Sequence, residues 1–302
     1  MKFTKPAISI NDQLALLRRR GMVIADEPSA RHYLQHISYY RLRAYWLPFE
    51  GPAPAAGDHV LKPGTTFEDA LALYVFDRQL RLLVMDAIER IEVAIRAGWA
   101  HHMAMTYGPH GYLDQAHHTG PVKHAECVAD LVKETGRSKD TFVKHYNKTY
   151  EDPTLPPVWM VAEVVSLGAL SKWIDNIKLR ADRQAIAKPF GVDEKVFGSF
   201  AHHVTIIRNI AAHHGRLWNK RFAFTMIVPN SPARLAVAMR GADRRYLHNT
   251  LVMLDHLLMV VAPGNEWRRR VVALITSCPQ VDPVQMGFPA DWQGRAAWRV
   301  VV

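Results

Sequence analysis

The chain has 302 residues, of which 49% are hydrophobic and 22% charged, a composition that excludes a largely disordered chain and allows a substantial folded core. Lys and Arg number 38 against 28 Asp and Glu, and the resulting formal charge of +10 favours a polyanionic partner such as nucleic acid. Cys127 and Cys278 lie far apart without a Cys-x-x-Cys motif. This argues against a disulfide framework and a thiolate zinc site, and it favours a reducing, cytoplasmic location.

The first 50 residues are predicted to be helical. Ser9 precedes a short helix that Gly21 closes, and residues 26–28 start another. Residues 32–46 are expected to form one or two helices rich in aromatic and basic side chains, ended by Pro48. Residues 51–63 are rich in Pro, Gly and Ala and are the first predicted loop or boundary.

A helix of roughly ten turns is predicted to follow, because no proline occurs between Pro63 and Pro109. Thr65 and Glu68 fit the capping-box pattern at its start. Apolar side chains recur three and four residues apart at positions 73, 76, 80, 83, 84, 88, 91 and 95. This segment is therefore expected to be the central scaffold helix.

The remainder is also predicted to be helical. We expect a weakly patterned helix up to Glu134, a loop at 151–157, a helical segment bent near 166–168, and helices near 180–188, 243–261 and 266–276. Asp193 and Gly215 should cap and close a helix from 194 to about 214, and residues 222–228 suit a short strand or an extended loop. The fold class is therefore all-α. No membrane span is expected, because polar residues interrupt the most apolar stretch, residues 247–262.

The end of the helix at 194–214 carries the densest polar cluster. This cluster contains Arg208, Asn209, His213 and His214, and Asn209 and His213 share a helix face. RNA cleavage without a metal needs proton transfer, which histidine performs near neutral pH, and a stable positive charge for the phosphate, which arginine supplies. Arg208 lies roughly 140° around the helix from His213, so its side chain must curl toward the site or meet it across an interface.

Other interpretations of these residues stay open from spacing alone. An Arg and a His five residues apart occur together by chance, and histidines near a helix C-terminus also interact favourably with the helix dipole. The four adjacent histidine pairs of the chain point in different directions on a helix, and no His-Glu-x-x-His motif occurs. We therefore expect no metal site and no cofactor.

Over nearly its whole length the chain resembles the Abi-like (AbiD/AbiF type) abortive-infection bacteriophage resistance proteins. The matching stretches, which occur together and in order, are residues 36–42, 74–81, 88–96, 157–160, 166–171, 208–219 and 286–292. The resemblance implies an all-helical HEPN-type ribonuclease core whose active motif is Arg, a polar residue, three variable residues and His. Arg208, Asn209 and His213 match that motif as the catalytic residues, whereas His214 is one position too far and is only a supporting candidate.

The resemblance also implies a domain organisation and a reaction. Residues 1–50 would form an N-terminal helical extension, residues 64–278 a HEPN-like bundle with an insertion around 108–157, and residues 279–302 an irregular tail. The endoribonuclease would leave 2′,3′-cyclic phosphate and 5′-hydroxyl ends. A homodimer is expected because one histidine cannot conveniently serve both proton transfers. The resemblance further raises a structured noncoding RNA as a restraining partner. The alternative is a catalytically silent RNA-binding or protein-interaction module.

Two further groups of residues are weaker candidates. Glu89, Arg90, Glu92 and Arg96 on the long helix are candidates to support the site, although a solvated, salt-bridged face is the favoured explanation for them. The aromatic and basic segment offers cations and stacking surfaces to single-stranded RNA, or else part of a core. Its candidate RNA-binding residues are Arg31, Tyr39, Tyr40, Arg41 and Arg43, with His32, Tyr45 and Trp46 beside them.

Overall fold

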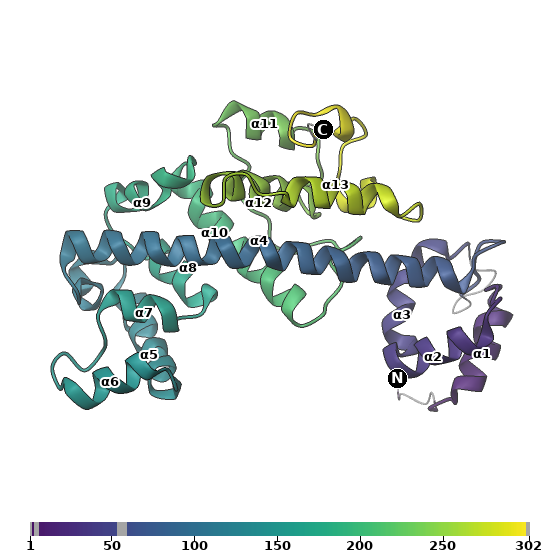
Figure 1. Ribbon diagram of the computed structural model, residues 1–302, viewed down its shortest axis with the longest axis horizontal. Helices are drawn as coiled ribbons and strands as arrows, with labels where there is room; N and C mark the ends of the chain where they lie inside the picture. Colours follow the sequence, from purple (N-terminus) through teal and green to yellow (C-terminus); the bar gives the residue numbers. More distant parts are fainter. Residues whose placement is uncertain (1, 3–5, 53–58, 300–302) are drawn as a thin grey trace. The chain divides into compact units, whose positions relative to one another are not determined.

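The computed structural model describes residues 2, 6–52 and 59–299, and the predicted all-α class is confirmed. These residues contain thirteen α-helices, six short 3₁₀ helices and isolated β-bridges, without a strand (Figure 1). The chain divides into two compact units, one of residues 1–80 and 273–282 and one of residues 81–272 and 283–302. The domain ranges expected from the sequence stay a prediction.

The first unit contains α1 (Ile10–Arg19), α2 (Glu27–Ile37) and α3 (Tyr39–Trp46). Ser9 and Asp12 form a capping box at the start of α1, as the helix-start pattern predicts. Ser38, at φ 78°, ends α2 and caps α3, so the aromatic segment forms two helices. The core of this unit includes Leu14, Leu34 and Leu42.

The long helix is α4 (Phe67–Tyr107), 41 residues in one piece. Its predicted apolar stripe is buried at every position, from Leu73 to Ile95. The capping box is shifted by one residue from the prediction: Thr66 and Asp69 bond reciprocally, with Asp69 N–H to Thr66 Oγ1 at 3.0 Å and Thr66 N–H to Asp69 Oδ2 at 2.9 Å. The prediction for Thr65 and Glu68 was therefore wrong, because an aspartate one position later closes the same ring of bonds.

The second unit holds the helices around the site. They are α5 (Pro121–Arg137), α6 (Thr141–Thr149), α7 (Val158–Val164), α8 (Leu167–Asp175), α9 (Arg180–Ala187), α10 (Glu194–Ala212), α11 (Ala233–Met239) and α12 (His248–Val261). The helix α13 (Trp267–Ser277) begins in this unit. The predicted bend near 166–168 is a break between α7 and α8, where Ser166 caps α8 by accepting from Ala169 N–H at 3.2 Å. The helices α8 and α10 pack side by side (Figure 1).

The helix α12 is buried around most of its circumference, and several of its buried polar side chains have partners. Asp255 pairs with Arg268 at 2.7 Å, and His248 accepts a hydrogen bond from Trp298 Nε1 at 3.1 Å. This helix begins at His248, five residues later than predicted, because residues 244–247 form a turn in which Asp243 O accepts from Tyr246 N–H at 3.1 Å and Asp243 Oδ1 accepts from Arg245 N–H at 2.9 Å. Among the described residues, no helix is long and apolar enough to cross a membrane.

Candidate functional site at the end of α10

The helix α10 ends earlier than predicted, in a turn built from the two histidines. Its last residue is Ala212, His213 is the C-cap, and His214 adopts a left-handed conformation at φ 58°. His214 N–H donates to Ala211 O at 3.0 Å and Gly215 N–H donates to Ile210 O at 2.7 Å. These two bonds define a Schellman motif, in which a histidine occupies the position that usually holds glycine.

Gly215 closes this turn for a steric reason. A Cβ added there would lie 3.0 Å from both the carbonyl oxygen and the Cγ2 atom of Ile210, which is tighter than ordinary contact. Leu217 and Trp218, two and three residues after Gly215, are fully buried. The turn that carries the histidines is therefore anchored to the core immediately after it reaches the surface.

Arg208, Asn209 and His213 belong to the last turns and the C-cap of α10. Asn209 and His213 are exposed, Arg208 is half-buried, and Arg208 Nη1 donates to Asn209 Oδ1 at 3.3 Å. His213 N–H donates to Asn209 O at 3.0 Å, so Asn209 contacts both neighbours. The arginine side chain thus turns toward Asn209, and its approach to His213 stays a prediction.

The supporting candidates on α4 have structural partners. Glu92 and Arg96 form an ion pair, and their side chains are 15% and 13% exposed. Arg96 Nη1 also donates to the carbonyl oxygens of Val165, at 2.6 Å, and of Ala162. These contacts bind α4 to the C-terminal end of α7, where helix carbonyls lack intrahelical partners.

The two remaining candidates on α4 lie nearer the surface. Arg90 pairs with Asp86 at 2.6 Å, and Asp86 also binds Arg270 at 3.2 Å. Glu89 is exposed. This arrangement is a surface ion-pair network, in agreement with the salt-bridged alternative weighed for this helix.

The RNA-binding candidates lie in the first unit and differ in how freely they reach solvent. Tyr40 is 88% exposed and Arg41 is exposed. Arg31 pairs with Glu27 at 2.8 Å, Arg43 lies 3.6 Å from Glu50, and Tyr39 accepts a hydrogen bond from Arg20. Burial raises the pKa of Tyr39.

Two aromatic residues of the same segment are part of the core. Tyr45 and Trp46 are 2% and 1% exposed, and Tyr45 Oη donates to Asp77 Oδ2 at 2.7 Å. Stacking of RNA bases on these two side chains is therefore excluded in this conformation. His32 is exposed, and its ring lies against those of Tyr33 and His36.

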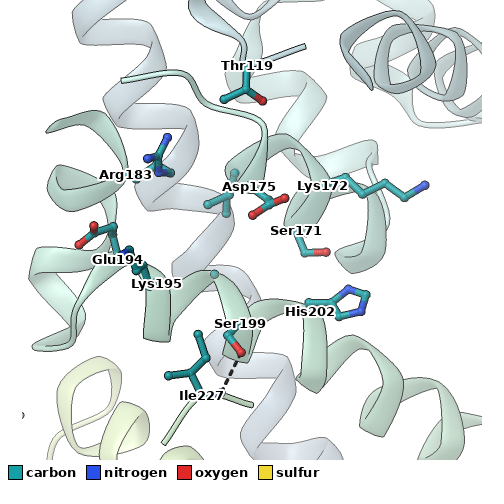
Figure 2. A pocket seen from close by; sticks show the side chains of 12 residues that line it. Thr119, Ser171, Lys172, Asp175, Arg183, Glu194, Lys195, Ser199, His202 and Ile227 are labelled. Carbon is teal, nitrogen blue, oxygen red and sulfur yellow. Dashed lines mark hydrogen bonds between the residues drawn. The ribbon is translucent and has the colours of Figure 1, made fainter. Parts of the chain in front are cut away.

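A hollow that the motif did not predict lies along the N-terminal half of α10. Its volume is about 720 Å³, and its lining includes Lys172 and Asp175 on α8 and Lys195, Ser199 and His202 on α10 (Figure 2). The exposed residues Lys195, His202 and Asn209 recur every seven positions, and residues at that spacing share a helix face. That periodicity is the sequence signal that could have linked the hollow to the motif.

The described residues contain no group of three His, Cys, Asp or Glu side chains placed to hold a metal ion. A family model described as Abi-like protein matches residues 32–219 of the chain. This range ends at Asn219, directly after the turn that carries the histidines, and contains every candidate site residue except Arg31. No curated protein and no solved structure matches the chain.

Proposed function

We propose that the chain, which belongs to the Abi-like protein family, is a metal-independent endoribonuclease of HEPN type. Membership in this family indicates a role in abortive-infection defence against phage. Within that role, Arg208, Asn209 and His213 would cleave RNA at a phosphodiester bond, using the turn at the end of α10 as the active site.

The observation that carries this proposal is that three polar residues lie within the last turns and the C-cap of α10, two of them joined by a side-chain hydrogen bond. Arg208 Nη1 donates to Asn209 Oδ1, and His213 follows Asn209 by one helical turn through the backbone bond from His213 N–H to Asn209 O. The buried Leu217 and Trp218 fix the turn to the core. A phosphate group approaching from solvent would meet a guanidinium, an amide and an imidazole on a short stretch of surface. Positioned groups of this kind can stabilise developing charge and transfer protons.

The reaction follows from the chemistry of these groups. A base removes the proton of the 2′-hydroxyl, the 2′-oxygen attacks phosphorus, and the bond to the 5′-oxygen breaks as that oxygen receives a proton. The products are a 2′,3′-cyclic phosphate and a 5′-hydroxyl. His213 performs one proton transfer, Arg208 holds the phosphate oxygens and their increased charge, and Asn209 orients Arg208.

The second proton transfer occurs at the oxygen on the opposite side of phosphorus. A second copy of the chain, related by a two-fold axis, would supply its own histidine there, so the active form is proposed to be a homodimer. Mixing the wild type with a growing excess of His213→Ala protein tests this assembly. If each copy supplies one histidine to a shared site, mixed dimers lack one proton transfer and the activity per wild-type chain falls; if each chain acts alone, the activity per wild-type chain stays constant.

The function itself is tested with purified protein and a pool of cellular RNA, comparing the wild type with His213→Ala and His214→Ala. His214 is a matched control because it is exposed, adjacent and also a histidine. We expect wild type and His214→Ala to cleave RNA in the presence of EDTA and His213→Ala to leave it intact. Equal cleavage by His213→Ala would reject the assignment of this residue. RNA binding without cleavage by any of the three proteins would favour a silent binding module.

A further inference from the structure

The hollow beside α10 lies on the same face as the proposed catalytic turn. His202 and His213 are eleven positions apart, which brings them to nearly the same angle around the helix axis, separated by roughly 16 Å along it. Figure 2 shows Ser199 and His202 on one side of the hollow and Ser171 and Asp175 of α8 on the other. A polymer bound at the turn can therefore continue along α10 into this space.

Some charged side chains around the hollow form hydrogen bonds or ion pairs with neighbouring groups. Glu194 is bound by Arg180 at 2.6 Å, which holds the pKa of that carboxyl at about 2, and Arg183 donates to the carbonyls of Ile177 and Lys178. Lys172 lies 3.8 Å from Asp130, but both side chains are well exposed, so the pair is weak.

The side chains that remain available face solvent. Lys195, His202 and Asp175 are exposed, and the described residues include no hydrogen-bond or ion-pair partner for these three side chains. Lys195 and Lys172 provide positive charge for a phosphate, whereas the Asp175 carboxylate can accept hydrogen bonds from the amino group of a base. Together they suit a nucleotide better than an isolated phosphate.

An exposed aromatic side chain stands next to these groups. Phe224 is 60% exposed, and its ring lies edge to face with the ring of His202, with 6.1 Å between the centroids. Its loop is fixed on both sides. Ile227 N–H donates to Ser199 Oγ at 2.9 Å (Figure 2), and Phe222 N–H donates to Arg245 O at 2.7 Å. Phe224 is thus an exposed ring on a well-anchored segment, as base stacking requires.

We propose that this region, formed by Lys195, His202 and Phe224 with Asp175, is a nucleotide-binding subsite for the same RNA strand that is cleaved at His213. The inference rests on the proposed function and deepens it, because it assigns a substrate class: single-stranded RNA that extends a few nucleotides beyond the scissile bond. A base stacks on Phe224, its amino group faces Asp175, and a neighbouring phosphate lies near Lys195.

A comparison of a long and a short RNA substrate distinguishes a role of Phe224 in binding RNA from a role in folding. Phe224→Ala should raise KM for a single-stranded RNA of about ten nucleotides by roughly tenfold, the loss of one base–aromatic stack, with little change in kcat. It should leave cleavage of a dinucleotide unchanged, because a dinucleotide is too short to reach Phe224. Phe224→Trp should bind the longer RNA like the wild type, and Tyr150→Ala, another exposed aromatic residue of the same unit, should change neither substrate.

Two results would overturn the subsite. One is an unchanged KM of Phe224→Ala for the longer RNA; the other is an equal loss on both substrates, which would indicate disturbed folding of the loop. If the wild type cleaves no RNA, the proposed function fails and the subsite is tested by fluorescence anisotropy with the same labelled RNA. Weaker binding by Phe224→Ala than by Tyr150→Ala would support the subsite, and equal binding would reject it.

Discussion

The histidines of α10 and α12 lie in two different environments: some are exposed to solvent and others are buried in the core. His202 and His203 are adjacent, yet His202 is exposed beside the hollow, whereas His203 is 3% exposed and lies 2.8 Å from Thr250 Oγ1. Burial lowers the pKa of His203 and of His248 on α12 to about 4. Near neutral pH the buried histidines are therefore uncharged parts of the core, whereas the exposed histidines meet solvent and any ligand.

Within the second unit, the buried polar residues should therefore contribute to stability and the exposed residues of α10 to catalysis. Changes at the exposed end of α10 should alter catalysis without altering folding, because their side chains bury little surface. Changes among the buried polar groups should lower the free energy of unfolding and leave the catalytic groups in place.

The largest effect is expected for His213→Ala. Removal of a group that transfers protons typically costs 10²- to 10⁴-fold in rate, so cleavage should fall by about that factor. The urea midpoint of unfolding should stay within the error of the wild type, because the ring is exposed. A variant that lost stability in proportion to activity would contradict this separation between catalysis and stability.

Arg208→Ala should lower kcat by about a hundredfold, the usual cost of removing one stabiliser of transition-state charge. Arg208→Lys should recover only part of the rate, because an ammonium group keeps the charge but not the planar pair of donors. Single-turnover rates of the three proteins on one RNA give the comparison. Full activity of Arg208→Lys would mean that charge alone is needed, and full activity of Arg208→Ala would remove this residue from the mechanism.

The ion pair on α4 should show the opposite behaviour. Arg96→Met leaves Glu92 and two carbonyl groups without their cation and should lower the free energy of unfolding by about 2 to 4 kcal/mol, measured by urea denaturation. Arg90→Met is the matched control, since the more exposed pair of Arg90 with Asp86 should contribute less than about 1 kcal/mol. Equal effects of the two substitutions would show that the contacts of Arg96 with α7 do not stabilise the fold.

The effect that is smallest per unit of change is a pH dependence of stability. In the unfolded chain a histidine titrates at its ordinary pKa of 6.5, whereas folded His203 and His248 titrate at about 4. Between these values the unfolded state binds more protons, so the free energy of unfolding should fall as pH decreases from 6.5 to 4 and should be unaffected by these groups above 6.5.

His248→Gln removes one of these titrations. The slope of unfolding free energy against pH should then decrease by up to about 1.4 kcal/mol per pH unit within that window. Denaturation at several pH values measures it. An unchanged slope would mean that protonated His248 is accommodated in the fold, despite its contacts with Trp298 and Asn249.

Local patterns predicted much of the fold, because helix starts and apolar stripes depend on neighbouring residues. The buried stripe of α4 and the break at Ser166 are examples. The exact caps were harder, since Thr66 competes with Thr65 for the same role. The partners of Arg96 and the position of Phe224 beside His202 could not be predicted, because they join segments distant in sequence and depend on tertiary packing.

The most direct test of the central claim is the chemistry of the RNA ends. A defined single-stranded RNA is incubated with the wild type and with His213→Ala, and the products are analysed by mass spectrometry. We expect 2′,3′-cyclic phosphate and 5′-hydroxyl ends with the wild type and no such products with the variant. Products with 5′-phosphate ends, or the same cyclic products from His213→Ala, would contradict this expectation.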